Sequence, residues 1–394
     1  MLRLIKKHSD IILLFFLGIL IFSFIVHFAK TDIRVHIKQA ITINISETHS
    51  YPANFLYYFV VNLLSGFSSN KFLMYKITII LLSIAIVAKY SISKNIIKLT
   101  LGKERVKLYG SKISFIAIGV FFCFAIPDPF SFFYLNKMYI VKVVPQVWHN
   151  TTIILLFPFA ILLFWQQLLI FDPLHKTTIR DIIIASVLVL LNIFIKPSFI
   201  FVYAPVTAFF LLYGYRNESL KFFILKLIPI FIAGIVVLGQ YYLIYKLQMG
   251  SIQKASSSVV ISSPFEIFAY FMPFWFIPIS LFISYIFPIF SVIMFKEIIK
   301  YRPFVYALCL TIAGIILSAF VMESGPRKYH GNFLWQNIIC SYLLLLSTVL
   351  FLTPKFLNKN LSTNKMRILI CLFFFQVISG ILYLFRIGFT FEYL

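Results

Sequence analysis

The sequence predicts an all-α integral membrane protein. We expect one polytopic transmembrane domain over residues 1–394, with about eleven transmembrane helices and surface helices on the outer face in the first loop. Three observations predict this fold class. Hydrophobic residues make up 61% of the chain and charged residues only 12%, whereas soluble domains are nearer half apolar and a quarter charged. Apolar stretches long enough to cross about 30 Å of hydrocarbon follow one another along the chain. Groups of lysine and arginine between them indicate cytoplasmic loops.

The net charge of +23 would suggest a nucleic-acid partner in a soluble protein. Here basic loops that set topology and contact anionic headgroups account for it. No basic, aromatic-rich patch lies outside the apolar stretches, so we expect a membrane as partner and no nucleic acid. Each of the four cysteines lies in an apolar run, which indicates neither a disulfide framework nor a zinc site: Cys123, Cys309, Cys340 and Cys371.

The first apolar stretch, 11–29, is too long for the core of a signal peptide and lacks a small-x-small cleavage site. We interpret it as an uncleaved helix with a cytoplasmic N-terminus. The stretch 91–112 is also expected to be a cytoplasmic loop, because six basic residues lie in it: Lys94, Lys98, Lys103, Arg105, Lys107 and Lys112. An even number of membrane crossings must separate the N-terminus from 91–112, because both are expected in the cytoplasm. The spans 11–29 and 72–90 supply two crossings. The short apolar stretch 53–67 therefore lies on, or dips into, the outer face.

Nine more spans are expected after residue 112, which places the C-terminus outside: 113–127, 151–171, 182–196, 198–214, 222–245, 265–293, 304–322, 333–352 and 368–390. Two of them, 113–127 and 182–196, are short for full spans. The serine-rich stretch 247–264 fits a lid or a plain linker equally well.

Under this topology, several ionisable side chains come to the outer side. Asp32 and His36 are four residues apart, so a helix places them on one face. Asp32 is a candidate general base for a hydroxyl group, with His36 tuning it or binding substrate. The alternative is that Asp32 only caps the helix that follows.

Lys196 interrupts an apolar stretch, and Pro197 breaks the helix beside it. A lysine at bilayer depth costs roughly 2.5–3.5 kcal/mol, so it should face a cavity or an anion. The alternative is that its ammonium group reaches the outer headgroups.

Glu323, Arg327 and His330 surround a Gly-Pro turn, and an arginine suits bidentate binding of phosphate. A simple salt bridge in the loop is the alternative. His149 and Asn150 begin an apolar helix, where they are candidates for substrate binding or for capping. One base and several cations on one side suit a substrate with a phosphate leaving group and a hydroxyl acceptor. The sequence has no nucleophile elbow, Gly-rich phosphate loop or HExxH motif.

Asp32 just after the first span, His36, Tyr51-Pro52 and the aromatic Phe55-Leu-Tyr-Tyr together resemble the first periplasmic loop of GT-C type membrane glycosyltransferases. That resemblance implies transfer of a sugar from a polyprenyl-phosphate donor to a glycan, lipid or protein acceptor. It implies a plasma (inner) membrane location, an outward-facing site and Asp32 as catalytic base. Ile33 stands where that family has a second acid. We therefore predict no metal, although a divalent cation held through Asp128 or Glu323 is left open.

Two other functions are open at this stage. A polysaccharide polymerase or ligase of the Wzy type is also a many-helix, outward-facing enzyme, but it relies on outer arginines, and only Arg34 and Arg327 are expected outside. A transporter of lipid-linked sugars would show internal repeats and several charges in mid-membrane, and only Lys196 has that character.

Overall fold

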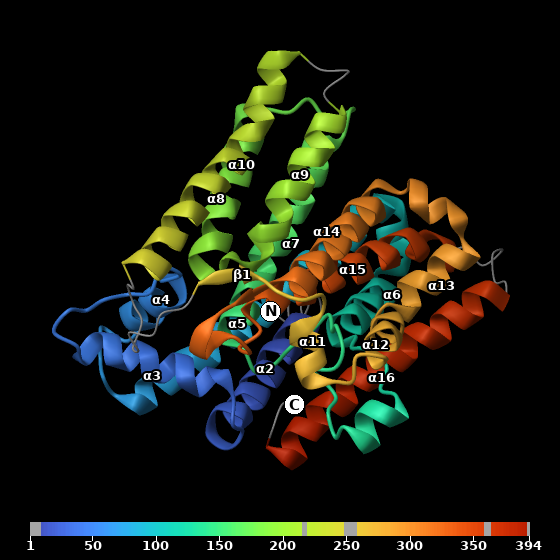
Figure 1. The fold of residues 1–394 in the computed structure, drawn as a ribbon. Helices are drawn as coiled ribbons and strands as arrows, with labels where there is room; N and C mark the ends of the chain where they lie inside the picture. The colour runs from blue at the N-terminus through green and yellow to red at the C-terminus, as the bar shows by residue number, and fades with distance from the viewer. Residues whose placement is uncertain (1–8, 215–218, 248–257, 358–363, 392–394) are drawn as a thin grey trace.

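The computed structural model describes residues 9–214, 219–247, 258–357 and 364–391. Most of this part of the chain is helical, with one small sheet (Figure 1). The predicted all-α class is therefore confirmed. Of the expected lid or linker at 247–264, residues 248–257 lie outside the described residues, and the described part 258–264 contains strand β1 (Val259–Ile261).

Eight helices are long and apolar enough to cross a membrane, which is compatible with a multi-pass membrane protein. They correspond to eight of the expected spans: Ser9–Phe28 (α2), Lys71–Leu101 (α5), Thr151–Phe171 (α7), Pro197–Gly214 (η2, Pro197–Phe199, and α9, Ile200–Gly214), Leu220–Lys246 (α10, Leu220–Tyr241, and η4, Tyr242–Lys246), Arg302–Phe320 (α14), Asn332–Leu357 (η7, Asn332–Leu334, and α15, Trp335–Leu357) and Asn364–Thr390 (α16). The count of eleven spans stays a prediction.

The expected span 265–293 is not one helix. It divides into α11 (Glu266–Phe271), α12 (Phe276–Ser284) and α13 (Ile286–Met294), and the last two meet at an angle of 67°. Pro288 accounts for this bend, because it has no N–H for the carbonyl of Ser284 and its ring would collide with that carbonyl. Pro273 likewise holds the preceding Met272 in an extended conformation, which ends α11.

The two short expected spans are helical as well. Residues 113–127 fall mainly in α6 (Lys103–Phe122), and 182–196 in α8 (Ile179–Ile195), which has 17 residues. The stretch 91–112 is not the loop that we expected. Helix α5 continues through it to Leu101, where Ile96 and Ile97 are buried, and α6 begins at Lys103. Gly102, at φ 77°, separates the two helices, and α6 is kinked at Tyr109.

The first loop contains two short helices, α3 (Asp32–Ile45) and α4 (Leu56–Leu64), of 14 and 9 residues. Neither is long enough to cross a bilayer, which requires about 20 residues. Both are of the length expected for surface helices.

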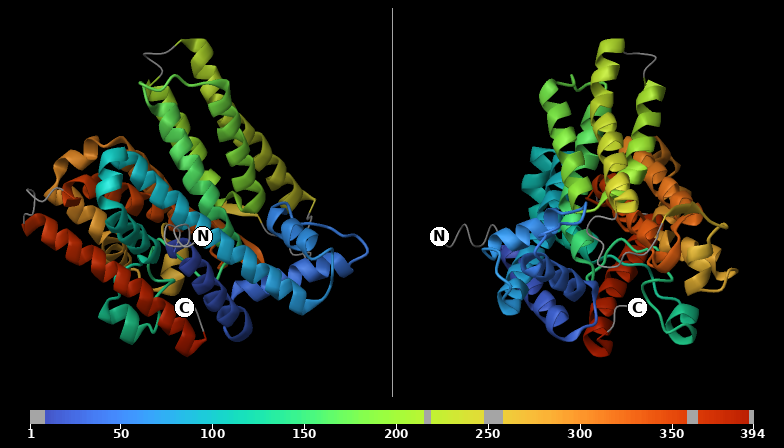
Figure 2. Two further views of the ribbon diagram at one scale, coloured as in Figure 1. Left: turned by 180° about the vertical axis from the view of Figure 1, so that it is seen from behind. Right: turned by 60° about the vertical axis from the view of Figure 1, so that its left-hand side comes forward.

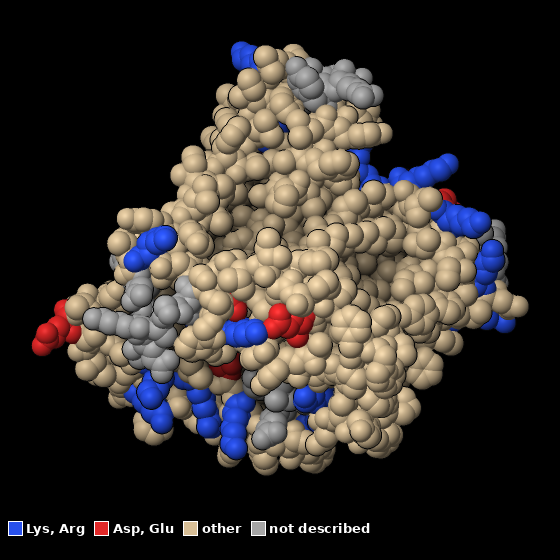
Figure 3. Space-filling view, viewed as in Figure 1, with Lys and Arg blue, Asp and Glu red and all other residues tan. Residues whose placement is uncertain are grey.

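Helices α7 and α15 lie at the centre of the molecule and are buried along most of their length. Helices α8, α9 and α10 stand together and lean away from the group formed by α6, α13, α14, α15 and α16, so that the two groups form a V (Figures 1 and 2). On the face shown in Figure 3, most lysines and arginines lie at the upper right and along the lower part of the molecule. The broad surface between these two regions shows almost no basic or acidic residues. This distribution fits a membrane-facing belt.

A two-stranded antiparallel sheet lies near the point of the V. Strand β1 pairs with β2 (Val321–Glu323), with Val259 opposite Glu323. After β2 come a short turn of helix, η6 (Gly325–Arg327), and then η7, and the positive φ of Gly325 and Gly331 shapes the chain between them. The sheet holds this segment over the ends of α14 and α15. Two further short helices are η1 (Phe130–Tyr134) and η5 (Lys296–Lys300).

Candidate functional site

One cavity of about 580 Å³ brings together most of the site residues that the sequence predicts. Its lining includes Asp32, His36, His149, Asn150, Lys196, Arg327 and His330. The eighth predicted residue, Glu323, lines a neighbouring cavity of about 320 Å³. Lys196, Arg327 and Asn332 line both cavities, so the two adjoin along these three side chains. We call them the main and the side cavity.

Asp32 is the first residue of α3 and is half-buried. Thr31 is the N-cap of that helix and makes no side-chain capping hydrogen bond. The Oδ2 atom of Asp32 accepts a hydrogen bond of 2.9 Å from Nδ2 of Asn150. The side chain of Asp32 is therefore held by another segment of the chain, and the simple capping interpretation does not describe it.

Asn150 caps α7 and orients Asp32 at the same time. Its Oδ1 atom accepts hydrogen bonds from the backbone N–H of Ile153 at 3.1 Å and from Oγ1 of Thr152 at 2.9 Å. The amide group is thus fixed on its acceptor side and offers its N–H to the carboxylate. The capping alternative for Asn150 is realised, and it is also what directs the donor towards Asp32.

His36 follows Asp32 by one turn of α3 and lines the same cavity. Its Nδ1 atom lies 2.6 Å from the hydroxyl group of Tyr58 in α4, and that hydroxyl donates to Oε1 of Gln39 at 2.8 Å. Because the hydroxyl proton is used on Gln39, Nδ1 of His36 carries a proton and Nε2 is left as an acceptor. Burial, assisted by the charge of Lys196, lowers the pKa of His36 to about 3, so the ring is neutral.

His149 is fully buried in an aromatic setting. Its ring meets that of Tyr139 edge-on at 4.7 Å and lies 6.0 Å from that of Trp335, and Nδ1 is 3.4 Å from the hydroxyl group of Tyr383. Burial, again assisted by Lys196, lowers the pKa of His149 to about 3. This residue is therefore a neutral part of the cavity wall.

Lys196 lies at the break between α8 and η2, where Pro197 begins the new helix. Its Nζ atom sits 4.6 Å from the centre of the Trp335 ring, an arrangement that stabilises a cation. The charges of Asp32, Arg327 and Glu323 all act on it. The ammonium group therefore lies among the charged groups of the two cavities, rather than apart from them as the headgroup interpretation required.

Glu323 is 4% exposed and its carboxylate is fully engaged. The Nη1 atom of Arg327 lies 3.5 Å from Oε1 of Glu323. The hydroxyl group of Tyr245 donates to the same oxygen at 2.7 Å, and the side-chain amide of Asn332 donates to Oε2. The salt-bridge alternative is thus realised. Arg327 nevertheless keeps 44% of its side chain exposed and lines both cavities, so its remaining N–H groups face the space between them.

The rim of the main cavity includes His330, which is exposed, and Tyr329. Lys142 also lines this cavity, but its ammonium group pairs with Asp128 and bonds to Ser131 at 2.9 Å. Burial acts to raise the pKa of Asp128, but hydrogen bonds from Lys142 and Ser131 outweigh it and hold the pKa below its ordinary value. This pair stabilises the loop before α7 and is not a free anion-binding group.

The donor set does not fit a divalent cation. In the described ranges, no group of three or more His, Cys, Asp or Glu side chains could hold a metal ion. Asp32 is the single carboxylate in the lining of the main cavity, and it shares that space with cations. Asp128 and Glu323, the two further acids considered from the sequence, are bound by Lys142 and Arg327. We assign no step to a metal.

The sequence did not point to three residues of this site. Asn332 lines both cavities, Trp335 lies beneath Lys196, and Tyr245 binds Glu323. Asn332 and Trp335 lie in the same polar segment as Arg327 and could have been suspected from that position. Tyr245 ends a long apolar stretch, where an aromatic residue is ordinary, and no local signal marks it.

Comparison of the chain with protein-family models, curated proteins and solved structures finds no match.

Proposed function

We propose that this protein is a membrane glycosyltransferase that moves a sugar from a polyprenyl-phosphate donor to an acceptor hydroxyl group. The observation that carries the proposal is the composition of the main cavity. One oriented carboxylate, Asp32, shares this cavity with two cations, Lys196 and Arg327. Among the described residues, Asp32 forms no direct ion pair with either cation, and Arg327 pairs with Glu323 instead. A base and an anion-binding pair in one cavity suit attack by a hydroxyl group and departure of a phosphate.

In the proposed reaction the acceptor oxygen attacks the anomeric carbon of the sugar, and its proton passes to Asp32. The bond between the anomeric carbon and the phosphate oxygen breaks, and the electron pair leaves with the polyprenyl phosphate. Lys196 and Arg327 stabilise the negative charge that develops on that phosphate. One displacement inverts the configuration at the anomeric carbon. Asn150 keeps the carboxylate in place, and the neutral ring of His36 offers Nε2 as an acceptor for a sugar hydroxyl group.

The side cavity supplies apolar surface next to the two cations. Its walls include Phe201 of α9, Val237 of α10 and Ile244 of η4, with Phe333 from the segment after β2. A phosphate held between Lys196 and Arg327 would therefore have room for the first isoprene units on this side. The acceptor, a glycan, a lipid or a protein, would then enter from the rim at Tyr329 and His330.

The proposed setting is the plasma (inner) membrane, with a cytoplasmic N-terminus and the main cavity facing outward. This orientation follows from the distribution of basic residues in the sequence. Cysteine-accessibility labelling of intact cells at Val35 and Tyr329, two exposed residues that line the cavity, would test it. Protection of both sites from a membrane-impermeant reagent in intact cells, with labelling after lysis, would overturn the orientation.

The function is tested with purified protein in lipid nanodiscs and a panel of sugars linked to polyprenyl phosphate. Release of free polyprenyl phosphate in the presence of mixed glycan and lipid acceptors is the readout. Asp32→Asn should lower turnover by about 10²–10⁴, the usual contribution of a general base. Glu47→Gln, which neutralises an exposed carboxylate later in the same loop, is the matched control and should leave turnover unchanged.

The two alternatives give different results in the same assay. A folded and fully active Asp32→Asn protein that loses turnover on Arg327→Met would favour the polymerase or ligase interpretation. Uptake of the intact lipid-linked sugar into proteoliposomes, without release of polyprenyl phosphate from any donor, would favour a transporter.

A further inference from the structure

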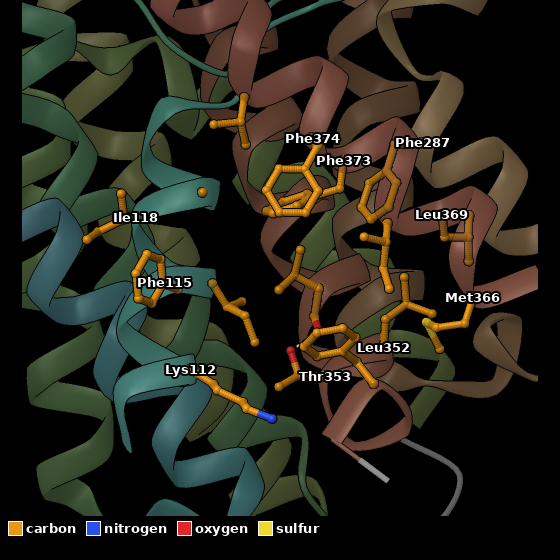
Figure 4. A pocket seen from close by; sticks show the side chains of 16 residues that line it. Lys112, Phe115, Ile118, Phe287, Leu352, Thr353, Met366, Leu369, Phe373 and Phe374 are labelled. Carbon is orange, nitrogen blue, oxygen red and sulfur yellow. Dashed lines mark hydrogen bonds between the residues drawn. The ribbon is translucent and has the colours of Figure 1, made fainter. Parts of the chain in front are cut away.

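A long apolar groove lies on a different part of the molecule from the two cavities. It has a volume of about 400 Å³ and runs between α6, α15 and α16, with Phe287 of α13 at its side (Figure 4). Lys112 is the one charged residue in its lining and Thr353 is the one other polar side chain. Both lie towards the same end, and aromatic rings such as Phe374 lie towards the other (Figure 4).

The groove is separate from the proposed active site. On α15 the main cavity is lined by residues up to Ile338, whereas the groove begins at Val349. At 1.5 Å per residue these positions are about 17 Å apart along the helix axis. Any ligand of the groove is therefore independent of the proposed sugar transfer.

The packing of α6 against α16 closes one side of the groove. A Cβ atom on Gly119 would come within 2.7 Å of the Phe373 ring, and one on Gly380 within 1.6 Å of the Phe122 carbonyl oxygen. Three residues separate Gly119 from Phe122 and seven separate Phe373 from Gly380, so the two helices do not keep one register but cross.

Positive charge marks one end of this groove. Lys112 lies there, and its side chain is exposed. By the distribution of basic loops this is the cytoplasmic end, where membranes carry anionic lipids.

We propose that this groove binds one anionic phospholipid, with an acyl chain along the apolar lining and the phosphate group at Lys112. A narrow apolar channel that ends in a cation matches a lipid with a negative headgroup. The flank of a second protein copy would leave that cation facing apolar side chains and is disfavoured for that reason. An acyl chain also fills space that water would not occupy, because the lining offers almost no hydrogen-bonding groups.

Native mass spectrometry of the purified full chain tests this proposal, with phosphatidylglycerol and phosphatidylcholine of the same acyl composition as probes. We expect one retained phosphatidylglycerol per chain and weaker retention of phosphatidylcholine. Lys112→Gln should weaken phosphatidylglycerol binding about fivefold, the effect of one basic residue near a membrane surface, and leave phosphatidylcholine unchanged. Lys107→Gln removes the same charge from an exposed position of α6 outside the lining, and it should change neither.

A second variant reports on the channel itself. Thr353→Phe adds bulk at its polar end and should lower retention of both lipids. Equal retention of the two lipids by the natural chain would overturn the proposal, as would equal effects of Lys112→Gln and Lys107→Gln. A dimer that Thr353→Phe dissociates, with phosphatidylglycerol retention unchanged, would show that a second copy occupies the groove and would also overturn it.

Discussion

Replacing Asn150 by aspartate or by alanine separates its two roles, because the same amide caps α7 and holds Asp32. Alanine removes both interactions. A lost N-cap costs about 0.5–2 kcal/mol, and a lost hydrogen bond to a charged group costs about 1.5–3 kcal/mol. Asn150→Ala should therefore destabilise the protein by about 2–5 kcal/mol. Aspartate caps a helix as well as asparagine does, so Asn150→Asp keeps the first interaction.

The aspartate variant replaces a donor with a second carboxylate at the place of a 2.9 Å contact. Two like charges at that distance repel by several kcal/mol even at an effective dielectric constant of about 20. The folded pair therefore retains a proton that the unfolded chain releases above about pH 4, so the stability of Asn150→Asp relative to the natural chain falls as the pH rises. The loss of stability caused by Asn150→Ala should depend on pH far less.

Thermal unfolding of detergent-solubilised protein at pH 4.5 and pH 7.5 measures both effects. Asn150→Asp should unfold near the natural temperature at pH 4.5 and several degrees lower at pH 7.5. If Asn150→Asp matches the natural chain at pH 7.5, the bond between Asn150 and Asp32 is not formed in the protein. If Asn150→Ala costs nothing at either pH, neither of the two interactions contributes to stability.

Three further predictions concern the charged groups around the main cavity. Lys196→Met and Arg327→Met should each lower kcat/KM about 10²–10³-fold, and the double variant should lose less than the product because both residues act on one phosphate; a double-mutant cycle with fully multiplicative losses would contradict this. Asp128→Asn leaves the ammonium group of Lys142 buried without a counter-charge and should lower the free energy of unfolding by about 3–5 kcal/mol in denaturation experiments. Adding Lys142→Met should recover part of this loss. Because the pKa of Asp128 is lowered in the folded chain, the stabilisation by this pair in the natural chain is lost as the pH falls below about 4. The depressed pKa of His36 keeps its ring neutral down to about pH 3, so kcat/KM should show no limb near pH 6.5, and a limb there that His36→Asn removes would refute the assignment.

The local pattern of the sequence was enough to place most helices. Apolar runs and their lengths depend only on neighbouring residues, and eight of the expected spans match long apolar helices of the structure. Charge clusters were a weaker guide, since six basic residues led us to expect a loop at 91–112 where helix continues. Lysines are good helix formers, and buried isoleucines on the same stretch pack against other helices.

The sequence by itself determined that this chain is a bundle of apolar helices and that Asp32, Lys196 and Arg327 are its exceptional polar positions. Only the tertiary structure decided their partners. Asn150 meets Asp32 across 118 positions of chain, and Trp335 comes to lie under Lys196 in the same way. Hydropathy and periodicity are properties of short windows, whereas these contacts arise from the packing of helices distant in the chain. The chemistry of the cavity depends on that packing, because it directs the carboxylate and the two cations into one space.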